Sequence, residues 1–189
     1  MDLNKPQKIS VCGFNGSGKT QLVKYLIKNY SGKVFVYDYH NEYKDLPDNV
    51  ITYVPKYKYD ETKIVEEYNL ILKKFFINSK LIKVLVVDES NAYNPNMKPL
   101  PFASQDLNDN QMHYNQTIIH ITRRMTDINT KLIELAHKRI FFKLFGKNDL
   151  QYLDALKKGL ADAVFNLEQY HFAILDEFGN VTICEPIAL

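Results

Sequence analysis

Residues 8–20 read KISVCGFNGSGKT, and this stretch decides the fold. It opens as a short strand, Lys8 to Cys12, and continues into a glycine-rich turn, Gly13 to Thr20, that matches the pattern G-x-x-x-x-G-K-[ST]. A helical stretch follows from about Gly18 to Asn29. Glycines let several backbone N–H groups point into one concavity, and the helix adds the positive end of its dipole. The stretch therefore predicts a phosphate-binding loop between a strand and a helix.

This pattern, known as Walker A, predicts roles for single residues. Lys19 would lie along the β- and γ-phosphates of a nucleoside triphosphate, and the Thr20 hydroxyl would bind Mg²⁺. We expect ATP and Mg²⁺ as the ligands. The predicted nucleotide-binding residues are Asn15, Gly16, Ser17, Gly18, Lys19, Thr20 and Gln21. The alternative is a glycine-rich turn that matches the pattern by chance, and the flanking strand and helix disfavour it.

Two acids end a near-continuous apolar segment, Leu81 to Val87. Such a segment is typical of a parallel strand that is covered on both faces. An acid at the carboxyl end of that strand points into the crevice where these sheets bind ligands. Asp88 is predicted to hold Mg²⁺ through its water shell, and Glu89 to polarise an attacking water as general base, the arrangement called Walker B. Two solvated acids at the end of a strand are the simpler alternative.

The reaction class is indicated by Glu89 and by the arginine content. A kinase must exclude water from the γ-phosphate, whereas a hydrolase must activate a water. Small nucleotide kinases also clamp phosphates with several arginines, and this chain has three, Arg123, Arg124 and Arg139. Both features favour hydrolysis over phosphate transfer, so a small kinase is the disfavoured hypothesis.

The strand predicted over Thr117 to Thr122 ends in Arg123 and Arg124. If this strand lies between the Gly13 strand and the Asp88 strand, its end faces the γ-phosphate, and Thr122 and Arg123 would report that phosphate. The predicted catalytic residues are therefore Lys19, Glu89, Arg123 and Arg124. Arg124→Ala is expected to abolish turnover and to spare ATP binding. The alternative for the two arginines is a pair of weak surface ion pairs.

Strands alternate with helices along the chain, which predicts an α/β fold with a mainly parallel sheet flanked by helices. The last two strand-like runs, His171 to Leu175 and Val181 to Cys184, are separated by a turn at Gly179 and predict a closing antiparallel β-hairpin. Longer helical stretches are expected over 60–78 and 126–136.

Composition excludes several classes of protein. The chain has 189 residues, 46% hydrophobic and 24% charged, and we expect a single domain over 1–189. No apolar run approaches the roughly 20 residues of a membrane helix, and the polar start, Met1 to Pro6, lacks the apolar stretch of a signal peptide. Cys12 and Cys184 form no ligand cluster, and the net charge of +2 gives no global basic field. We therefore expect neither a membrane, a secreted nor a disulfide-rich protein.

The sequence resembles the FtsK–HerA superfamily of DNA-pumping ATPases in four segments. These are the Gly13–Thr20 turn, Val86 to Glu89, Ile121 to Arg124, and Leu135 to Phe142. The first two are specific. The short length and the closing stretch from Gln169 to Phe172 look most like the genome-packaging ATPases of tailless archaeal viruses with an internal membrane.

The resemblance implies a RecA-like P-loop fold of the additional-strand catalytic-glutamate type, in a ring that is usually hexameric and moves double-stranded DNA through a central pore. It also implies a capsid or membrane protein at the packaging vertex as partner, and a place in the host cytoplasm or on the virion. Arg123 stands where the family usually has a glutamine sensor, and Met112 where it commonly has an arginine that reaches the neighbour's nucleotide. The trans arginine is therefore Arg123, Arg124 or Arg139, or it is absent.

Contact with DNA is inferred from lysines on predicted loops. Tyrosines are interspersed with Lys56, Lys58 and Lys98 in these loops. Several weak contacts of each subunit with DNA phosphates would bind the duplex regardless of its base sequence. The loop from Ser90 to Pro101 directly follows the predicted general base, so hydrolysis would move it, and it is the preferred pore element. Lysines that keep a tyrosine-rich surface soluble are the alternative. The segment from Asp38 to Glu42 follows the second strand and could approach the active crevice, and a capped polar loop is the plainer interpretation.

Two hypotheses for the function follow. The first is an ATP- and Mg²⁺-driven DNA translocase subunit of the viral genome-packaging type. The second is a nucleotide-dependent assembly or switch ATPase that acts on protein partners. ATPase activity that is stimulated by duplex DNA, together with a ring, would distinguish the first from the second.

Overall fold

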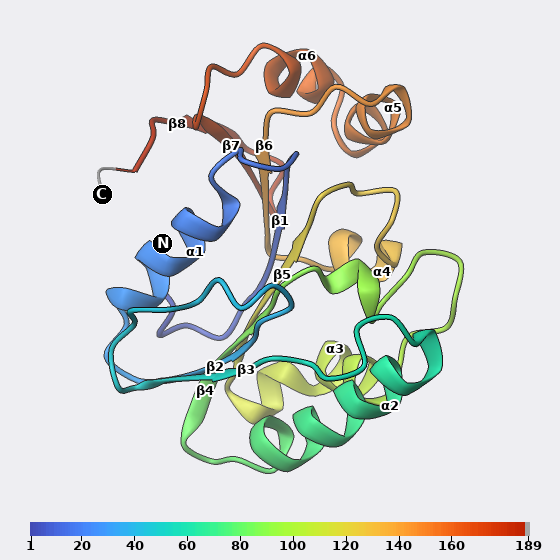
Figure 1. Ribbon diagram of the computed structural model, residues 1–189. Coiled ribbons are helices and arrows are strands. Elements are labelled where there is room, and N and C mark those ends of the chain that lie inside the picture. The colour runs from blue at the N-terminus through green and yellow to red at the C-terminus, as the bar shows by residue number, and fades with distance from the viewer. Residues whose placement is uncertain (188–189) are drawn as a thin grey trace.

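The computed structural model describes residues 1–187, in which eight strands form one sheet flanked by helices (Figure 1). The strands are β1 (Lys8–Cys12), β2 (Lys33–Tyr37), β3 (Val50–Tyr53), β4 (Ile82–Val87), β5 (Thr117–Thr122), β6 (Lys138–Phe142), β7 (Phe172–Asp176) and β8 (Val181–Cys184). In the sheet they lie in the order β3-β2-β4-β5-β1-β6-β7-β8. Residues 188–189 of the predicted domain lie outside the described residues.

The first six strands in this order, β3, β2, β4, β5, β1 and β6, are parallel to one another. Strand β7 pairs antiparallel with β6, and β8 pairs antiparallel with β7. The predicted α/β fold with a mainly parallel sheet and a closing hairpin is therefore confirmed. Gly179 lies in the hairpin turn with φ of 83°, a backbone conformation that favours glycine.

The helices are α1 (Lys19–Lys28), α2 (Glu61–Leu72), α3 (Phe102–Tyr114), α4 (Thr130–Glu134), α5 (Lys147–Leu156) and α6 (Leu160–Phe165), with a π-helical turn η1 (Lys73–Ile77) and a 3₁₀ turn η2 (Ser90–Ala92). The expected helix over 60–78 thus changes to a π-helical turn after Leu72. In this turn Phe76 is fully buried and Phe75 stacks on Phe35 of β2 with ring centroids 5.9 Å apart. No helix within residues 1–187 is long and apolar enough to cross a membrane.

Helix α4 is shorter than the helix predicted over 126–136, because the residues before it bond to a neighbouring loop. The carbonyl of Asp127 accepts a hydrogen bond from the Asn96 N–H at 2.9 Å, and Ile128 forms a β-bridge with Pro95. Asn129 then caps the helix, since its side chain accepts from the Lys131 N–H. Tertiary contacts therefore keep residues 126–129 out of the helix, in a turn that ends in the bridge at Ile128.

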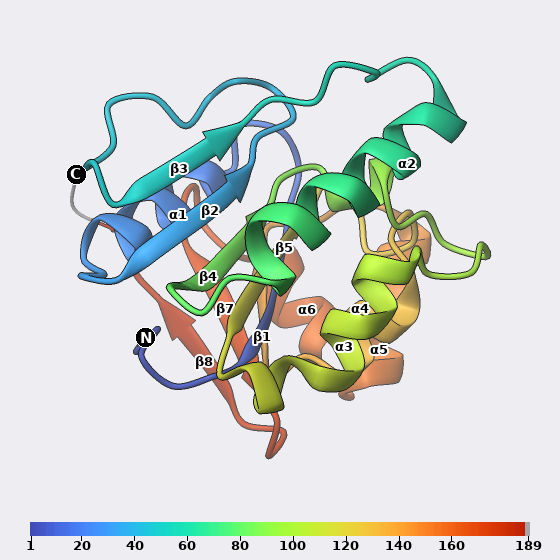
Figure 2. The ribbon, with the colours of Figure 1, turned by 90° about the horizontal axis from the view of Figure 1, so that it is seen from below.

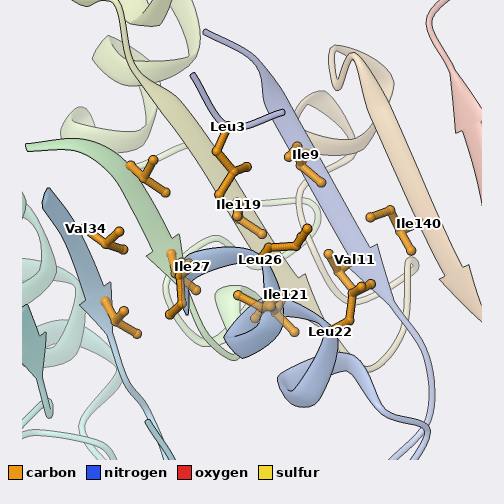
Figure 3. Close-up of a cluster of buried hydrophobic side chains, with 14 of the residues drawn as sticks. Leu3, Ile9, Val11, Leu22, Leu26, Ile27, Val34, Ile119, Ile121 and Ile140 are labelled. Carbon is orange, nitrogen blue, oxygen red and sulfur yellow. The ribbon is translucent and has the colours of Figure 1, made fainter. Parts of the chain in front are cut away.

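Helix α1 covers one face of the sheet, and α2 to α6 lie on the other face (Figure 2). On the first face Leu22, Leu26 and Ile27 of α1 pack against the central strands, including Val11 (Figure 3). The next residue of β1, Cys12, belongs to the core of the opposite face. Central strands are therefore buried on both sides, which accounts for apolar runs without alternation.

Strand β5 lies between β1 and β4, as the sequence analysis requires for a strand end that faces the γ-phosphate. Cys12 pairs with Thr122 and Val87 pairs with His120, so the carboxyl ends of the three strands meet at one edge of the sheet. This edge carries the predicted phosphate-binding loop and the acids that follow β4.

Candidate functional site

Three glycines shape the loop between β1 and α1. A Cβ atom on Gly13 would come within 2.6 Å of the Phe142 side chain and 2.7 Å of the Ser17 hydroxyl. Gly16 and Gly18 have φ of 77° and 107°, in the region that side chains rarely adopt. The loop therefore requires glycine at these positions in order to curl in front of α1.

Lys19, the first residue of α1, is buried beneath the loop. Its Nζ donates hydrogen bonds to the carbonyl oxygens of Gly13 at 2.7 Å and Phe14 at 2.9 Å. Burial lowers the pKa of Lys19, and the carboxylates of Glu89 and Asp88 act against that shift. Because charged phosphate oxygens accept stronger hydrogen bonds than neutral carbonyls, this ammonium group is suited to exchange its present partners for a phosphate.

Asp88 ends β4 in a position that concentrates negative charge. Its side chain is buried, and burial together with Glu89, Asp38 and Glu42 raises its pKa to about 7. Its backbone N–H donates to the Tyr37 carbonyl at 3.0 Å, which ties the acid to the neighbouring strand. A cation beside this carboxylate would relieve the cost of its burial.

The residues around Asp88 fit Mg²⁺ and a phosphate chain. Among residues 1–187, Asp88 Oδ2 and Ser17 Oγ are buried side-chain atoms without a hydrogen-bond partner. The Thr20 hydroxyl donates to Glu42 Oε2 at 3.3 Å, so it too lies among the acids. No group of three or more His, Cys, Asp or Glu in the described part of the chain could hold a metal alone. Mg²⁺ would therefore need the Thr20 hydroxyl, phosphate oxygens and water besides Asp88.

Glu89 has a left-handed backbone, with φ of 45° and ψ of 49°, which is uncommon for a residue with a side chain. Its Oε1 accepts a charge-assisted hydrogen bond from Arg123 Nε at 2.7 Å. His40, in the loop after β2, lies at the same point, with Nε2 2.9 Å from Arg123 Nη2 and 3.6 Å from Glu89 Oε1. The two predicted catalytic residues therefore meet, together with a histidine.

The other two arginines have different partners. Arg124 Nε lies 3.2 Å from Oδ2 of Asp149, a buried carboxylate at the start of α5. Arg139 Nε donates to the carbonyl of Ile133 at 2.8 Å. Sequence reasoning grouped Arg124 with Arg123, and the structure brings Arg123 to the predicted general base and Arg124 to α5.

Both alternatives for the segment from Asp38 to Glu42 hold, because the loop is capped and it also reaches the site. The loop is indeed capped, because the Asp38 carboxylate accepts from the N–H groups of Glu42 at 3.0 Å and Tyr43 at 2.9 Å. Sequence reasoning did not include His40 and Glu42 among the site residues. The signal that could have found them is their place after β2, which pairs in parallel with β4 and ends at the same edge.

Two hollows flank the loop, and they differ in character. The charged hollow has a volume of about 290 Å³ and is lined by Asn15, Gly16, Lys19, Thr20, His40, Glu42, Asp88, Glu89 and Arg123. The apolar hollow has a volume of about 260 Å³ and is lined by Gly18, Gln21, Phe142, Tyr170, Phe172, Pro186 and Ile187. A nucleoside triphosphate has one charged end and one flat aromatic end, and the two hollows match these ends in kind.

Comparison with known proteins identifies the family. The family model described as helicase HerA, central domain, matches residues 2–168. No curated protein matches the sequence.

Several solved structures have the same fold at low sequence identity. The genome packaging NTPase B204 from Sulfolobus turreted icosahedral virus 2, in complex with ATP-gammaS, has a TM-score of 0.77 at 21% identity, and the match covers 100% of both chains. B204, the DNA-packaging ATPase from Sulfolobus turreted icosahedral virus, gives a TM-score of 0.79 at 20% identity, over 98% of this chain and 100% of that chain. VirB4 of Thermoanaerobacter pseudethanolicus gives 0.70 at 12% identity, over 96% of this chain and 90% of that chain.

Proposed function

This chain belongs to the family of the helicase HerA central domain, and from that premise we propose that it is the ATP-hydrolysing subunit of a motor that pumps double-stranded DNA in viral genome packaging. The family makes it an ATPase of the FtsK–HerA type. The observation that carries the proposal is the charged hollow, in which Lys19, Thr20, Asp88 and Glu89 meet. These are the residue types that bind a triphosphate and activate water against it.

The nucleotide would lie across the phosphate-binding loop. In this arrangement the γ-phosphate occupies the charged hollow, Lys19 contacts the β- and γ-phosphates, and the N–H groups of the loop bind the remaining oxygens. The base occupies the apolar hollow, where Tyr170 offers an aromatic face. The proposal is supported by Gly18 and Gln21, which line the apolar hollow directly beside the loop.

Mg²⁺ would be held by the Thr20 hydroxyl, by phosphate oxygens and, through water, by Asp88. When bound, the ion neutralises charge on the β- and γ-phosphates. The buried Asp88 carboxylate, with its pKa raised to about 7, supports this assignment because a cation would favour its charged form.

Glu89 would act as general base for hydrolysis. A water held between its carboxylate and the γ-phosphate transfers a proton to the carboxylate as it attacks the phosphorus in line with the leaving oxygen. Arg123, 2.7 Å from Glu89, lines the same hollow and is the proposed γ-phosphate sensor. Arg124 stays a proposed catalytic residue that would act from its own subunit or on a neighbour.

DNA contact is proposed for the segments that carry Lys58 and Lys98. Both residues line one groove at the start of α2, where Lys98 Nζ forms an ion pair with Glu61 at 3.1 Å. Tyr59 and Met97, 99% and 96% exposed, project from the same two segments. Weak phosphate contacts from these exposed segments would act without regard to base sequence.

Not every tyrosine near these lysines is available to DNA. Tyr93 is fully buried against Tyr37 and Tyr68, and the Tyr53 hydroxyl donates to Glu67 at 2.7 Å. Proximity in sequence did not distinguish these side chains from the exposed Tyr59, because burial depends on the sheet and α2.

We extend the proposal to the assembly. A ring of identical subunits, hexameric as is usual in the superfamily, would multiply the weak contacts of each Lys58 and Lys98 segment around one duplex. Each subunit would consist of the single domain over 1–189, and the motor would act in the host cytoplasm or on the virion with a capsid or membrane protein at the packaging vertex.

The test is the ATPase rate measured with and without duplex DNA, with the assembly examined by electron microscopy. We expect DNA to stimulate hydrolysis in a ring-forming protein, and Lys98→Glu to remove the stimulation. Lys28→Glu, at the far end of α1, is the matched control and is expected to keep it. Hydrolysis that DNA leaves unchanged would instead favour an assembly or switch ATPase that acts on proteins, and stimulation that survives Lys98→Glu would contradict the DNA assignment.

A further inference from the structure

We propose that His40 is a positioning residue that holds Arg123 against Glu89, so that the general base stays in an ion pair until a γ-phosphate draws Arg123 away. The proposal rests on the proposed function, in which Glu89 activates water. It adds a residue to the site and a means by which the presence of the third phosphate controls the base.

Arg123 lies between two acceptors. Its Nε donates to Glu89 Oε1 at 2.7 Å, and its Nη2 lies 2.9 Å from His40 Nε2. Because a guanidinium offers donors alone, we assign Nε2 as the acceptor and the ring proton to Nδ1. His40 Nε2 and Glu89 Oε1 are 3.6 Å apart, beyond hydrogen-bond distance. His40 therefore acts on Glu89 through the guanidinium.

Neighbouring residues hold the His40 ring and its loop in place. The Tyr39 ring packs edge-on against the His40 ring with centroids 4.9 Å apart, and the Tyr39 hydroxyl donates to the Lys58 carbonyl at 3.2 Å. The buried Asp38 carboxylate accepts from the Tyr43 N–H at 2.9 Å and so closes the loop that carries His40. A ring held in this way can orient the side chain of Arg123.

The present contacts of Arg123 compete with the binding of a phosphate, because they occupy two of its five N–H donors. Nε and Nη2 are two of the donors with which a guanidinium binds a phosphate in bidentate fashion. While they bond to Glu89 and His40, these two donors are unavailable to a ligand, and the guanidinium occupies an acceptor site of Glu89 Oε1 and holds the carboxylate in the ion pair. A γ-phosphate in the charged hollow competes for these donors and frees the carboxylate. ADP, which lacks that phosphate, leaves the pair closed.

The test compares His40→Ala with His40→Gln, which keeps an acceptor. Isothermal titration calorimetry with Mg²⁺ measures the affinities for ATPγS and for ADP. We expect His40→Ala to bind ATPγS about threefold or more tightly than the wild type, because Arg123 gives up one contact fewer. The ADP affinity and the KM for ATP in the two variants separate this effect from damage to the loop, since ADP affinity should stay unchanged. The basal kcat of His40→Ala should rise by a similar factor, and His40→Gln should return both values toward the wild type.

Three results would overturn the proposal. An unchanged ratio of ATPγS to ADP affinity, or an equal loss of both, would limit His40 to support of the loop. A fall in kcat with unchanged affinities would make His40 an aid to hydrolysis. If the wild-type protein bound neither nucleotide, the proposed function would fail together with this inference, and that result is distinct because it is seen before any variant is measured.

Discussion

The charged hollow and the apolar hollow are similar in volume and lie on either side of one loop, but they are built in opposite ways. In the charged hollow, Asp88 is buried with a raised pKa, and Lys19 bonds to carbonyls of its own loop. In the apolar hollow, Phe142 and Phe172 pack with tilted rings, their centroids 5.3 Å apart, and continue the hydrophobic core. Hydrophobic packing accounts for the side chains of the apolar hollow, whereas burying the charges of the charged hollow costs free energy of folding. The difference points to a ligand with a charged end, and it predicts that substitutions in the charged hollow act more strongly.

The largest effect is predicted for a residue outside both hollows. Arg124→Ala is expected to abolish turnover and to spare ATP binding, because a guanidinium at the transferred phosphate contributes about 10³–10⁵ in rate. Steady-state ATPase assays and nucleotide titrations check the two parts. Since Arg124 also pairs with buried Asp149, the double variant Arg124→Ala/Asp149→Asn is the control. Turnover that returns in the double variant would assign Arg124 to neutralising Asp149 and would contradict its catalytic role.

The next effect tests the charged hollow itself. Glu89→Gln keeps the size of the side chain but removes the proton acceptor, so kcat should fall by about 10²–10⁴ while ATP affinity is kept. Glu66→Gln, on the exposed side of α2, is the matched control and should keep the wild-type rate. A Glu89→Gln variant with full activity would mean that another group activates the water.

Much of this site could be predicted from the sequence, because its signals are local. The glycine-rich turn and the acids after the Leu81–Val87 segment each combine a short pattern with a strand end, and the structure brings both to one edge. The place of His40 after the second strand indicated that its segment could approach the site, but its contact with Arg123 could not be assigned, because that contact depends on β2 pairing with β4, a long-range choice that no local pattern encodes. Tyr170 could not be assigned to the apolar hollow for a similar reason. It precedes β7, which is distant from the loop in sequence, and the pairing of β7 with β6 brings it beside Gly18.

A graded effect is predicted at the apolar hollow. Tyr170 lies beside Gly18, and its φ of 65° is unusual for tyrosine. Tyr170→Ala should weaken ATP binding about tenfold, because stacking of a base on an aromatic ring contributes roughly 1–3 kcal/mol. Tyr170→Phe should bind ATP as the wild type does. The affinity for inorganic tripolyphosphate, which has no base, should be equal in all three proteins, and an unequal affinity would mean that Tyr170 acts on the loop instead.

The smallest effect concerns a support behind the charged hollow. His120 of β5 is buried, and its Nδ1 lies 2.8 Å from the hydroxyl of Ser90, the residue after Glu89. Burial, with a smaller effect of Lys8, lowers the pKa of His120 to about 4 from its usual 6.5. The native state therefore keeps the ring neutral where the unfolded chain binds a proton, so its contribution to stability is complete above pH 6.5 and is lost as the pH falls toward 4.

Urea denaturation at pH 7 and pH 4.5 measures this loss. The wild type should lose roughly 1–3 kcal/mol more of its free energy of unfolding between the two pH values than His120→Asn, which has no proton to bind there. The comparison uses the difference between pH values, so a general destabilisation of the variant does not affect it. Equal losses in both proteins would mean that His120 is protonated in the native state.

The central claim is that the loop after β1 binds a triphosphate through Lys19. Calorimetric titration of the purified protein with ATP and Mg²⁺ tests it most directly. The wild type and Lys28→Ala, a control at an exposed position of the same helix, should bind, and Lys19→Ala should lose that binding. A wild-type protein that fails to bind ATP, or a Lys19→Ala variant that binds it equally well, would contradict the account.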